Sequence, residues 1–137
     1  MPSGRILLVE DDAAIREGVA ETLAFEGYQA EGVRNGREAL EWLEREGPPS
    51  LVVLDLFMPV MNGAQLLAML HADPRWSGVP AVLMSAALPA PDALPPADAY
   101  LQKPFDLDEL VSTVARWCPP AGGGPGPGQS AGPEAQR

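Results

Sequence analysis

The chain has 137 residues, a length that suits one domain with one hydrophobic core, and 46% of them are hydrophobic. Its 19 acidic and 9 basic residues give a formal net charge of -10, which argues against nucleic-acid binding, because phosphate contacts need a basic surface. No apolar run reaches the length of a membrane span or a secretory signal, and the single cysteine excludes an intrachain disulfide. We therefore expect a cytoplasmic protein that binds neither nucleic acid nor membrane.

Short apolar runs alternate with amphipathic stretches along most of the chain. In order they predict a strand over residues 5–10, a helix that Asp12 caps and that runs to about Phe25, a weaker strand over 27–33 and a helix between Asn35 and Gly47. A strand over 51–56, a helix over 62–72, strands over 80–86 and 99–103, and a last helix with a capping-box-like start at Asp106 and Glu109 follow. The apolar stripe of that last helix is predicted to be Leu107, Leu110, Val111, Val114 and Trp117. The alternation indicates an α/β fold, a doubly wound five-stranded parallel sheet covered on both faces.

The composition changes near residue 118. The last 19 residues contain five prolines and six glycines, a composition that cannot bury enough apolar surface to fold. We therefore predict a folded domain over residues 1–118 and a disordered Gly/Pro-rich tail over 119–137.

Polar side chains stand at the ends of four of the five predicted strands. They are Asp11 and Asp12 at the end of the first strand, Asp55 at the end of the third, Ser85 at the end of the fourth and Lys103 at the end of the fifth. Because parallel strands end at the same edge of a sheet, we expect these groups to meet there. Three of these residues also have a plainer explanation when taken alone: Asp12 as a helix N-cap, Ser85 as a polar strand end and Lys103 as a surface cation.

The chemistry of this set is specific. Clustered carboxylates repel each other by about 4 kcal/mol per pair at 4 Å and an effective dielectric near 20, and a hard divalent cation such as Mg²⁺ relieves that repulsion. With the charge neutralised, a carboxylate oxygen of Asp55 can attack a phosphorus atom and form an aspartyl phosphate. Lys103 would stabilise the phosphoryl oxygens, and Ser85 would donate a hydrogen bond to them.

Four segments, "ILLVEDD", "LVVLDLFMPVMNG", "LMSA" and "AYLQKPF", together resemble the receiver domains of two-component response regulators. The resemblance covers about residues 1–118 and implies a flavodoxin-like sheet. It implies the following roles: Asp11 and Asp12 as the acidic pair that holds Mg²⁺, Asp55 as the phosphoacceptor, the backbone carbonyl of Phe57 as a further metal ligand, Ser85 and Tyr100 as switch residues, Lys103 as the phosphate-binding lysine before a cis peptide bond to Pro104, and Pro59 and Gly63 as turn residues.

The same resemblance implies a signalling function. The chain would take a phosphoryl group from a sensor histidine kinase or phosphotransfer protein, and we expect a stand-alone regulator whose output is contact with an unknown protein target. It is not expected to be an enzyme beyond phosphorylating itself from a phosphodonor and slowly losing the group. Four prolines within residues 89–96 predict that the fourth helix of the family is shortened or replaced by a loop, because a proline inside a helix costs about 3 kcal/mol.

Two alternative functions are consistent with parts of this pattern. A phosphohydrolase with an aspartate nucleophile would need an acid two residues later, where this chain has Phe57. A degenerate receiver that acts as a phosphorylation-independent interaction module stays open. His71 is the only histidine and is interpreted as a helix-surface residue, so the phosphodonor histidine is expected on another protein.

Overall fold

A computed structural model describes residues 4–118 of the chain. The elements are β1 (Arg5–Val9), α1 (Ala13–Phe25), β2 (Gln29–Val33), α2 (Gly36–Glu46), β3 (Leu51–Asp55), α3 (Gly63–Ala72), β4 (Ala81–Ser85), the 3-10 turn η1 (Pro91–Ala93), β5 (Ala99–Gln102) and α4 (Leu107–Trp117). The predicted tail over 119–137 lies outside the described residues. Within residues 4–118, no helix has the length and apolar character needed to cross a bilayer.

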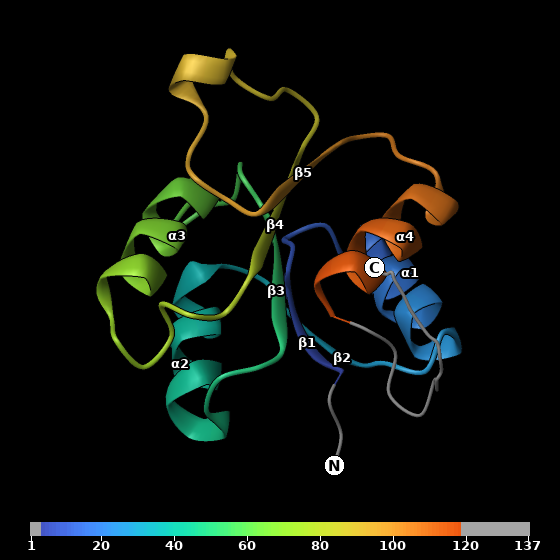
Figure 1. Ribbon diagram of the computed structural model, residues 1–137, viewed down its shortest axis with the longest axis horizontal. Coiled ribbons are helices and arrows are strands. Elements are labelled where there is room, and N and C mark those ends of the chain that lie inside the picture. The colour runs from blue at the N-terminus through green and yellow to red at the C-terminus, as the bar shows by residue number, and fades with distance from the viewer. Residues whose placement is uncertain (1–3, 119–137) are drawn as a thin grey trace.

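The five strands form one parallel sheet in the order β2-β1-β3-β4-β5. Helices α2 and α3 cover one face, and α1 and α4 cover the other (Figure 1). The predicted doubly wound five-stranded architecture is therefore confirmed. The strand order reverses between β1 and β3, and in such sheets ligands bind at the carboxyl ends of the strands near that point.

Two apolar clusters hold the layers together, one on each face of the sheet. All five residues of β3 and all five of β4 are buried, as expected of central strands covered on both faces. Val52 and Leu54 pack in the cluster under α2 and α3, while Leu51 and Val53 pack in the cluster under α1 and α4. Alternate side chains of β3 thus pack into the two clusters, and its last residue, Asp55, lies at the carboxyl edge of the sheet.

The last helix departs from its prediction in two respects. Asp106 stands at the N-cap position of α4, but its side chain makes no capping hydrogen bond, so the predicted capping box is wrong. Leu110 and Val114 are buried, whereas Leu107 is 56% exposed and Trp117 37% exposed. The reason is geometric: Leu110, Val114 and Cys118 lie four residues apart and face the sheet, whereas Leu107 and Trp117 fall outside that row.

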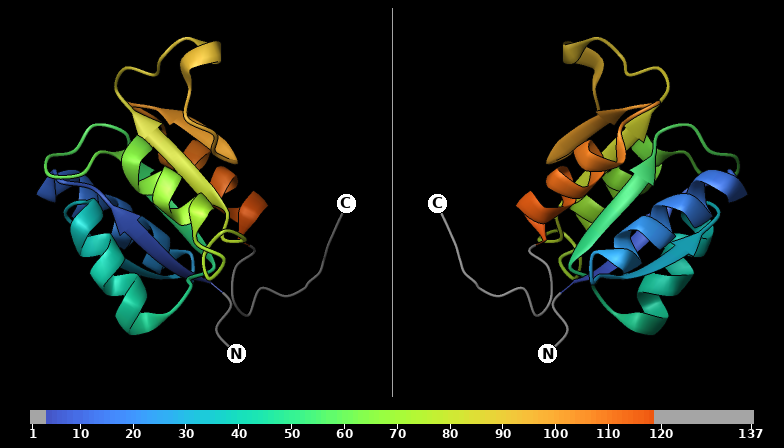
Figure 2. Two further views of the ribbon diagram at one scale, coloured as in Figure 1. Left: turned by 90° about the vertical axis from the view of Figure 1, so that its left-hand side faces the viewer. Right: turned by 90° about the vertical axis from the view of Figure 1, so that its right-hand side faces the viewer.

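The segment between β4 and β5, residues 86–98, contains the 3-10 turn η1 and no α-helix, which confirms the disrupted fourth helix. It projects beyond the body of the domain in all views (Figure 1, Figure 2). The Tyr100 hydroxyl donates to the Pro95 carbonyl at 2.7 Å and accepts from the Ala97 N–H at 3.0 Å. The Asp98 carboxylate accepts from the Ala81 N–H at 2.8 Å. A few side-chain contacts therefore hold this segment in place of helical hydrogen bonds.

Hydrogen exchange should be uneven along residues 86–98. In the described structure the N–H groups of Leu88 and Ala90 have no acceptor, whereas Asp98 donates to the Ala81 carbonyl at 2.8 Å and Ala97 to Tyr100. We expect Leu88 and Ala90 to exchange at least about tenfold faster than Ala97 and Asp98. In a Tyr100→Phe variant, NMR-detected exchange of Ala97 should become fast while Asp98 stays slow. Uniformly slow exchange across the segment would contradict this description.

Candidate functional site

Lys103 joins two buried carboxylates at the carboxyl edge of the sheet. Its Nζ donates to Glu10 Oε1 at 2.7 Å and to Asp55 Oδ2 at 3.1 Å. Glu10 is 1% exposed and Asp55 5% exposed. Asp11 is exposed, and one carboxylate oxygen from each of Glu10, Asp11 and Asp55 lies within 4.8 Å of the others. Three carboxylates and one ammonium leave this cluster with two negative charges in excess.

Burial and pairing shift the pKa values in this cluster. Burial raises the pKa of the Glu10 carboxyl, and the hydrogen bonds that it accepts from Lys103 and from the Asp12 N–H only partly oppose that rise. Burial alone would lower the pKa of the Lys103 ammonium, but its hydrogen bonds to Glu10 and Asp55 outweigh burial and raise it. Lys103 is therefore charged at neutral pH, and the excess of carboxylates makes the site ready for a further cation.

The structure gathers Glu10, rather than Asp12, with Asp11 and Asp55. Asp12 is exposed, and its Oδ1 accepts from the Ile15 N–H at 3.0 Å as the N-cap of α1. Glu10 Oε2 accepts from the Asp12 N–H at 3.0 Å, so the buried acid also fixes the start of the loop. Of the two explanations of Asp12 that the sequence left open, the structure favours the N-cap. Spacing carried the signal: Asp12 stands three residues before Ile15, as an N-cap should.

The remaining predicted residues lie around the cluster. Ser85 ends β4, is fully buried, and its Oγ accepts from the Ala87 N–H at 3.1 Å. The Phe57 N–H donates to Asp55 Oδ1 at 3.4 Å, while its ring is 59% exposed. Tyr100 lies on β5 and is partly buried, with its hydroxyl bound to the segment over residues 86–98. The Lys103–Pro104 peptide bond is cis, as the resemblance implies.

A tight turn connects Asp55 to α3. Val60 has a φ of 70°, and the Met61 N–H donates to the Pro59 carbonyl at 2.7 Å. A branched residue with positive φ is strained, and such strain gathers near functional sites. The Gly63 N–H then donates to the Leu56 carbonyl at 2.8 Å, which places the start of α3 directly against the end of β3.

A Gly63→Ala variant should lose about 1–3 kcal/mol of unfolding free energy, because the added Cβ would overlap the Asp55 carbonyl oxygen and come 2.8 Å from the Leu56 Cα. Both neighbours are backbone atoms and cannot rotate away. Urea unfolding measures the loss. Gly78→Ala is the matched control: a Cβ there meets no atom within 4 Å, so its stability should stay within about 0.5 kcal/mol of wild type. Equal stability of the two variants would contradict the close approach.

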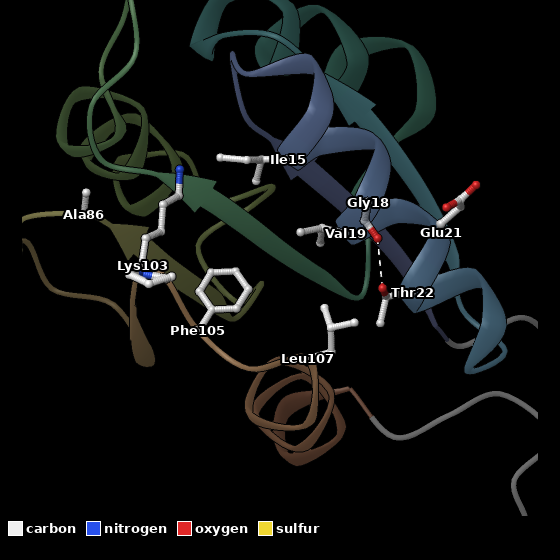
Figure 3. A pocket seen from close by; sticks show the side chains of 10 residues that line it. Ile15, Gly18, Val19, Glu21, Thr22, Ala86, Lys103, Phe105 and Leu107 are labelled. Carbon is white, nitrogen blue, oxygen red and sulfur yellow. Dashed lines mark hydrogen bonds between the residues drawn. The ribbon is translucent and has the colours of Figure 1, made fainter.

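A largely apolar hollow of about 590 Å³ opens beside the cluster. It lies between α1 and the segment that leads into α4, and Ile15, Val19, Phe105 and Leu107 line it (Figure 3). The stem of Lys103 forms part of its wall. The carboxyl edge of the sheet is thus bordered on this side by a largely apolar surface.

The pattern of groups can be compared with known proteins. Residues 6–115 match the model of the response regulator receiver domain family. The chain belongs to that family. This match covers most of the chain, including every residue of the carboxylate cluster and Lys103.

Relatives of this receiver domain are response regulators. It is 40% identical over 114 residues to the DNA-binding response regulator MtrA of Mycobacterium tuberculosis, a match over 80% of this chain and 48% of the relative. It is 36% identical to the response regulator MprA of Mycobacterium leprae, over 80% of this chain and 49% of that protein. The chain therefore spans about half the length of the curated relatives that it matches.

Solved receiver domains share the fold. The signal receiver domain of a signal transduction histidine kinase from Syntrophus aciditrophicus has a TM-score of 0.77 and 35% identity, covering 83% of this chain and 89% of that one. The receiver domain of the sensor histidine kinase PA1611 from Pseudomonas aeruginosa has a TM-score of 0.76 and 28% identity, covering 84% of this chain and 97% of that one. That structure has a magnesium ion coordinated in the active site cleft.

Proposed function

We propose that this receiver domain accepts a phosphoryl group on Asp55 from a phosphohistidine of a sensor kinase or phosphotransfer protein. The observation that carries the proposal is the Lys103 ammonium, which bonds to Asp55 at 3.1 Å and to Glu10 at 2.7 Å. It places a cation beside the acceptor oxygen, where phosphoryl charge must be stabilised. The family match supports a signalling module rather than a conventional enzyme.

In the proposed reaction, an Asp55 carboxylate oxygen attacks the phosphorus atom of the donor. The new O–P bond forms as the P–N bond to the donor imidazole breaks, and the imidazole nitrogen takes the electron pair. Asp55 is buried, so bulk water has little access to its carboxylate oxygens. Lys103 then pairs with the phosphoryl oxygens, and the Ser85 hydroxyl turns to donate to them.

The carboxylate cluster suits Mg²⁺, which prefers hard oxygen ligands and few protein carboxylates. Asp11 and Asp55 would hold the ion with Glu10 beside them, and we propose Glu10 in place of Asp12 in this set. The backbone carbonyl of Phe57 remains a proposed ligand. When bound, Mg²⁺ neutralises carboxylate charge and stabilises phosphoryl oxygens.

Phosphorylation is proposed to act through Ser85 and Tyr100 on a protein-binding surface. The Tyr100 hydroxyl is bonded to Pro95 and Ala97, so an inward movement of the ring would release both contacts. Residues 86–98 are therefore the part of the surface most directly coupled to the proposed switch. The target protein and a cytoplasmic location stay predictions. The relative MtrA is a DNA-binding response regulator, and DNA binding is not part of the function proposed for this chain.

Incubation with acetyl phosphate and Mg²⁺ should add one phosphoryl group to wild type, and an excess of EDTA should prevent it. Intact-mass spectrometry measures the gain, and loss of the added mass on treatment with hydroxylamine identifies an acyl phosphate. A wild type that gains no mass under these conditions, and none from any kinase, would favour the alternative, a phosphorylation-independent interaction module.

A further inference from the structure

The side chain of Arg16 reaches back from the first turns of α1 to the loop that carries two of the clustered carboxylates. Its Nη1 donates to the Glu10 carbonyl oxygen at 2.8 Å and is 3.4 Å from the Asp11 carbonyl oxygen. The Arg16 backbone N–H donates to the Asp12 carbonyl at 2.9 Å. Both the backbone and the side chain of Arg16 therefore bond to the loop before α1. Arg16 is half-buried.

The stem of Arg16 lies across β2 at a position without a side chain. A Cβ added to Gly32 would lie 2.7 Å from Arg16 Cγ and 2.9 Å from Arg16 Cδ. Gly32 is paired with Leu8 of β1, two residues before Glu10. The path of the arginine from α1 to the loop is therefore open because residue 32 is glycine.

These bonds involve peptide carbonyls and leave the carboxylates free. The Glu10 carbonyl belongs to the peptide group that links the buried Glu10 to the exposed Asp11, so a bond to it constrains the backbone from which both side chains leave. Lys103, in contrast, bonds directly to carboxylate oxygens. Arg16 adds positive charge beside the cluster without occupying an oxygen that a cation would use.

We propose that Arg16 is a positioning residue for a divalent-cation site formed by Glu10, Asp11 and Asp55. By holding the Glu10 and Asp11 carbonyls, it fixes the directions in which the two side chains leave the backbone. Outer partners that orient metal ligands are typically worth about 10–100-fold in metal affinity. The inference rests on the proposed function, because it takes Mg²⁺ as the ligand of the cluster.

The test is a Mg²⁺ titration of the unphosphorylated protein, followed by calorimetry and by NMR of the Lys103 side chain. Lys103 is the only lysine, so lysine labelled at Cε gives one signal from the site itself. Arg16→Met, which keeps the stem and removes the donors, should bind Mg²⁺ about 10–100-fold more weakly. Arg16→Lys should recover part of the loss. Arg37→Met is the matched control, since Arg37 is an exposed α2 arginine whose ion pair is with Glu41, and it should bind like wild type.

Gly32→Ala provides an independent variant in which Arg16 is intact but its stem must move. It should weaken Mg²⁺ binding severalfold in the wild-type background and have no further effect on Arg16→Met, as expected of two changes that act through one contact. A folded Arg16→Met or Gly32→Ala protein that binds Mg²⁺ as tightly as wild type would overturn the positioning role alone. A wild type without Mg²⁺ binding would overturn the cation site and this role together.

Discussion

Asp55→Asn should abolish the phosphoryl gain that is expected of wild type with acetyl phosphate and Mg²⁺. The amide oxygen is a poor nucleophile toward phosphorus, and the variant loses the negative charge that Lys103 faces at 3.1 Å. Because asparagine has nearly the same size and still accepts a hydrogen bond from Lys103, the fold should be retained. Intact mass should show no phosphorylated species, so the expected change is from nearly complete labelling to none.

Two neighbouring substitutions serve as controls and separate the acidic residues from one another. Asp12→Asn should be phosphorylated like wild type, because asparagine caps a helix as well as aspartate does. Asp11→Asn should need much more Mg²⁺ for the same rate. If Asp55→Asn is labelled as well as wild type, another residue is the acceptor. If Asp12→Asn behaves like Asp11→Asn, Asp12 takes part in the cation site after all.

Lys103→Met should lower the unfolding free energy and the rate of phosphoryl gain, but it should raise the affinity for Mg²⁺. Without Mg²⁺ at neutral pH, unfolding free energy should fall by about 3 kcal/mol, because removing one partner leaves buried carboxylates uncompensated. Mg²⁺ should bind more tightly than to wild type and restore part of the lost stability, because it neutralises the same carboxylates. The rate of phosphoryl gain should still fall by about a hundredfold or more, because the proposed role of Lys103 is to stabilise the phosphoryl oxygens.

The stability loss should also depend on pH in a defined direction. Burial already raises the pKa of Glu10, and removing Lys103 removes a group that lowers it. A carboxyl whose pKa is higher in the folded state stabilises the fold below its unfolded pKa, and that contribution is lost as pH rises through the folded pKa. Urea titrations at pH 4 and pH 7 should therefore show a smaller deficit at pH 4. A deficit independent of pH, or an equal one in the exposed control Arg116→Met, would reject the electrostatic explanation.

The fold could be predicted because each element has a local cause that the structure confirms. Asn35 and Asn62 accept hydrogen bonds from the N–H groups of Glu38 and Gln65 and begin their helices where the sequence indicates. Continuous apolar runs predicted β3 and β4 as central strands, and both are completely buried. The prolines predicted the loss of a helix before β5, since a missing N–H is a property of the residue itself.

Side-chain partners were harder to predict because they depend on tertiary structure. Glu10 and Asp12 are both acids next to β1, and only the fold shows that Lys103, more than ninety positions later, pairs with Glu10. Asp106 has the residue type and position of an N-cap, yet makes no such bond. The route of Arg16 over Gly32 depends on the register of β1 with β2, which a single sequence does not state.

The proline-rich connection before β5 has a consequence for the entropy of folding. Four of the residues in 86–98 are prolines, whose φ angles are already restricted in the unfolded chain. Each proline at a compatible position reduces the entropy lost on folding by about 0.4–1 kcal/mol, so this connection keeps a defined shape with few internal hydrogen bonds. A change in the arrangement of this connection would break only the few hydrogen bonds made by the Tyr100, Asp98 and Gln102 side chains. It would not break the hydrogen bonds of a whole helix. The proposed phosphorylation of Asp55 would have to break only these few bonds to move this connection, and every other element would stay folded.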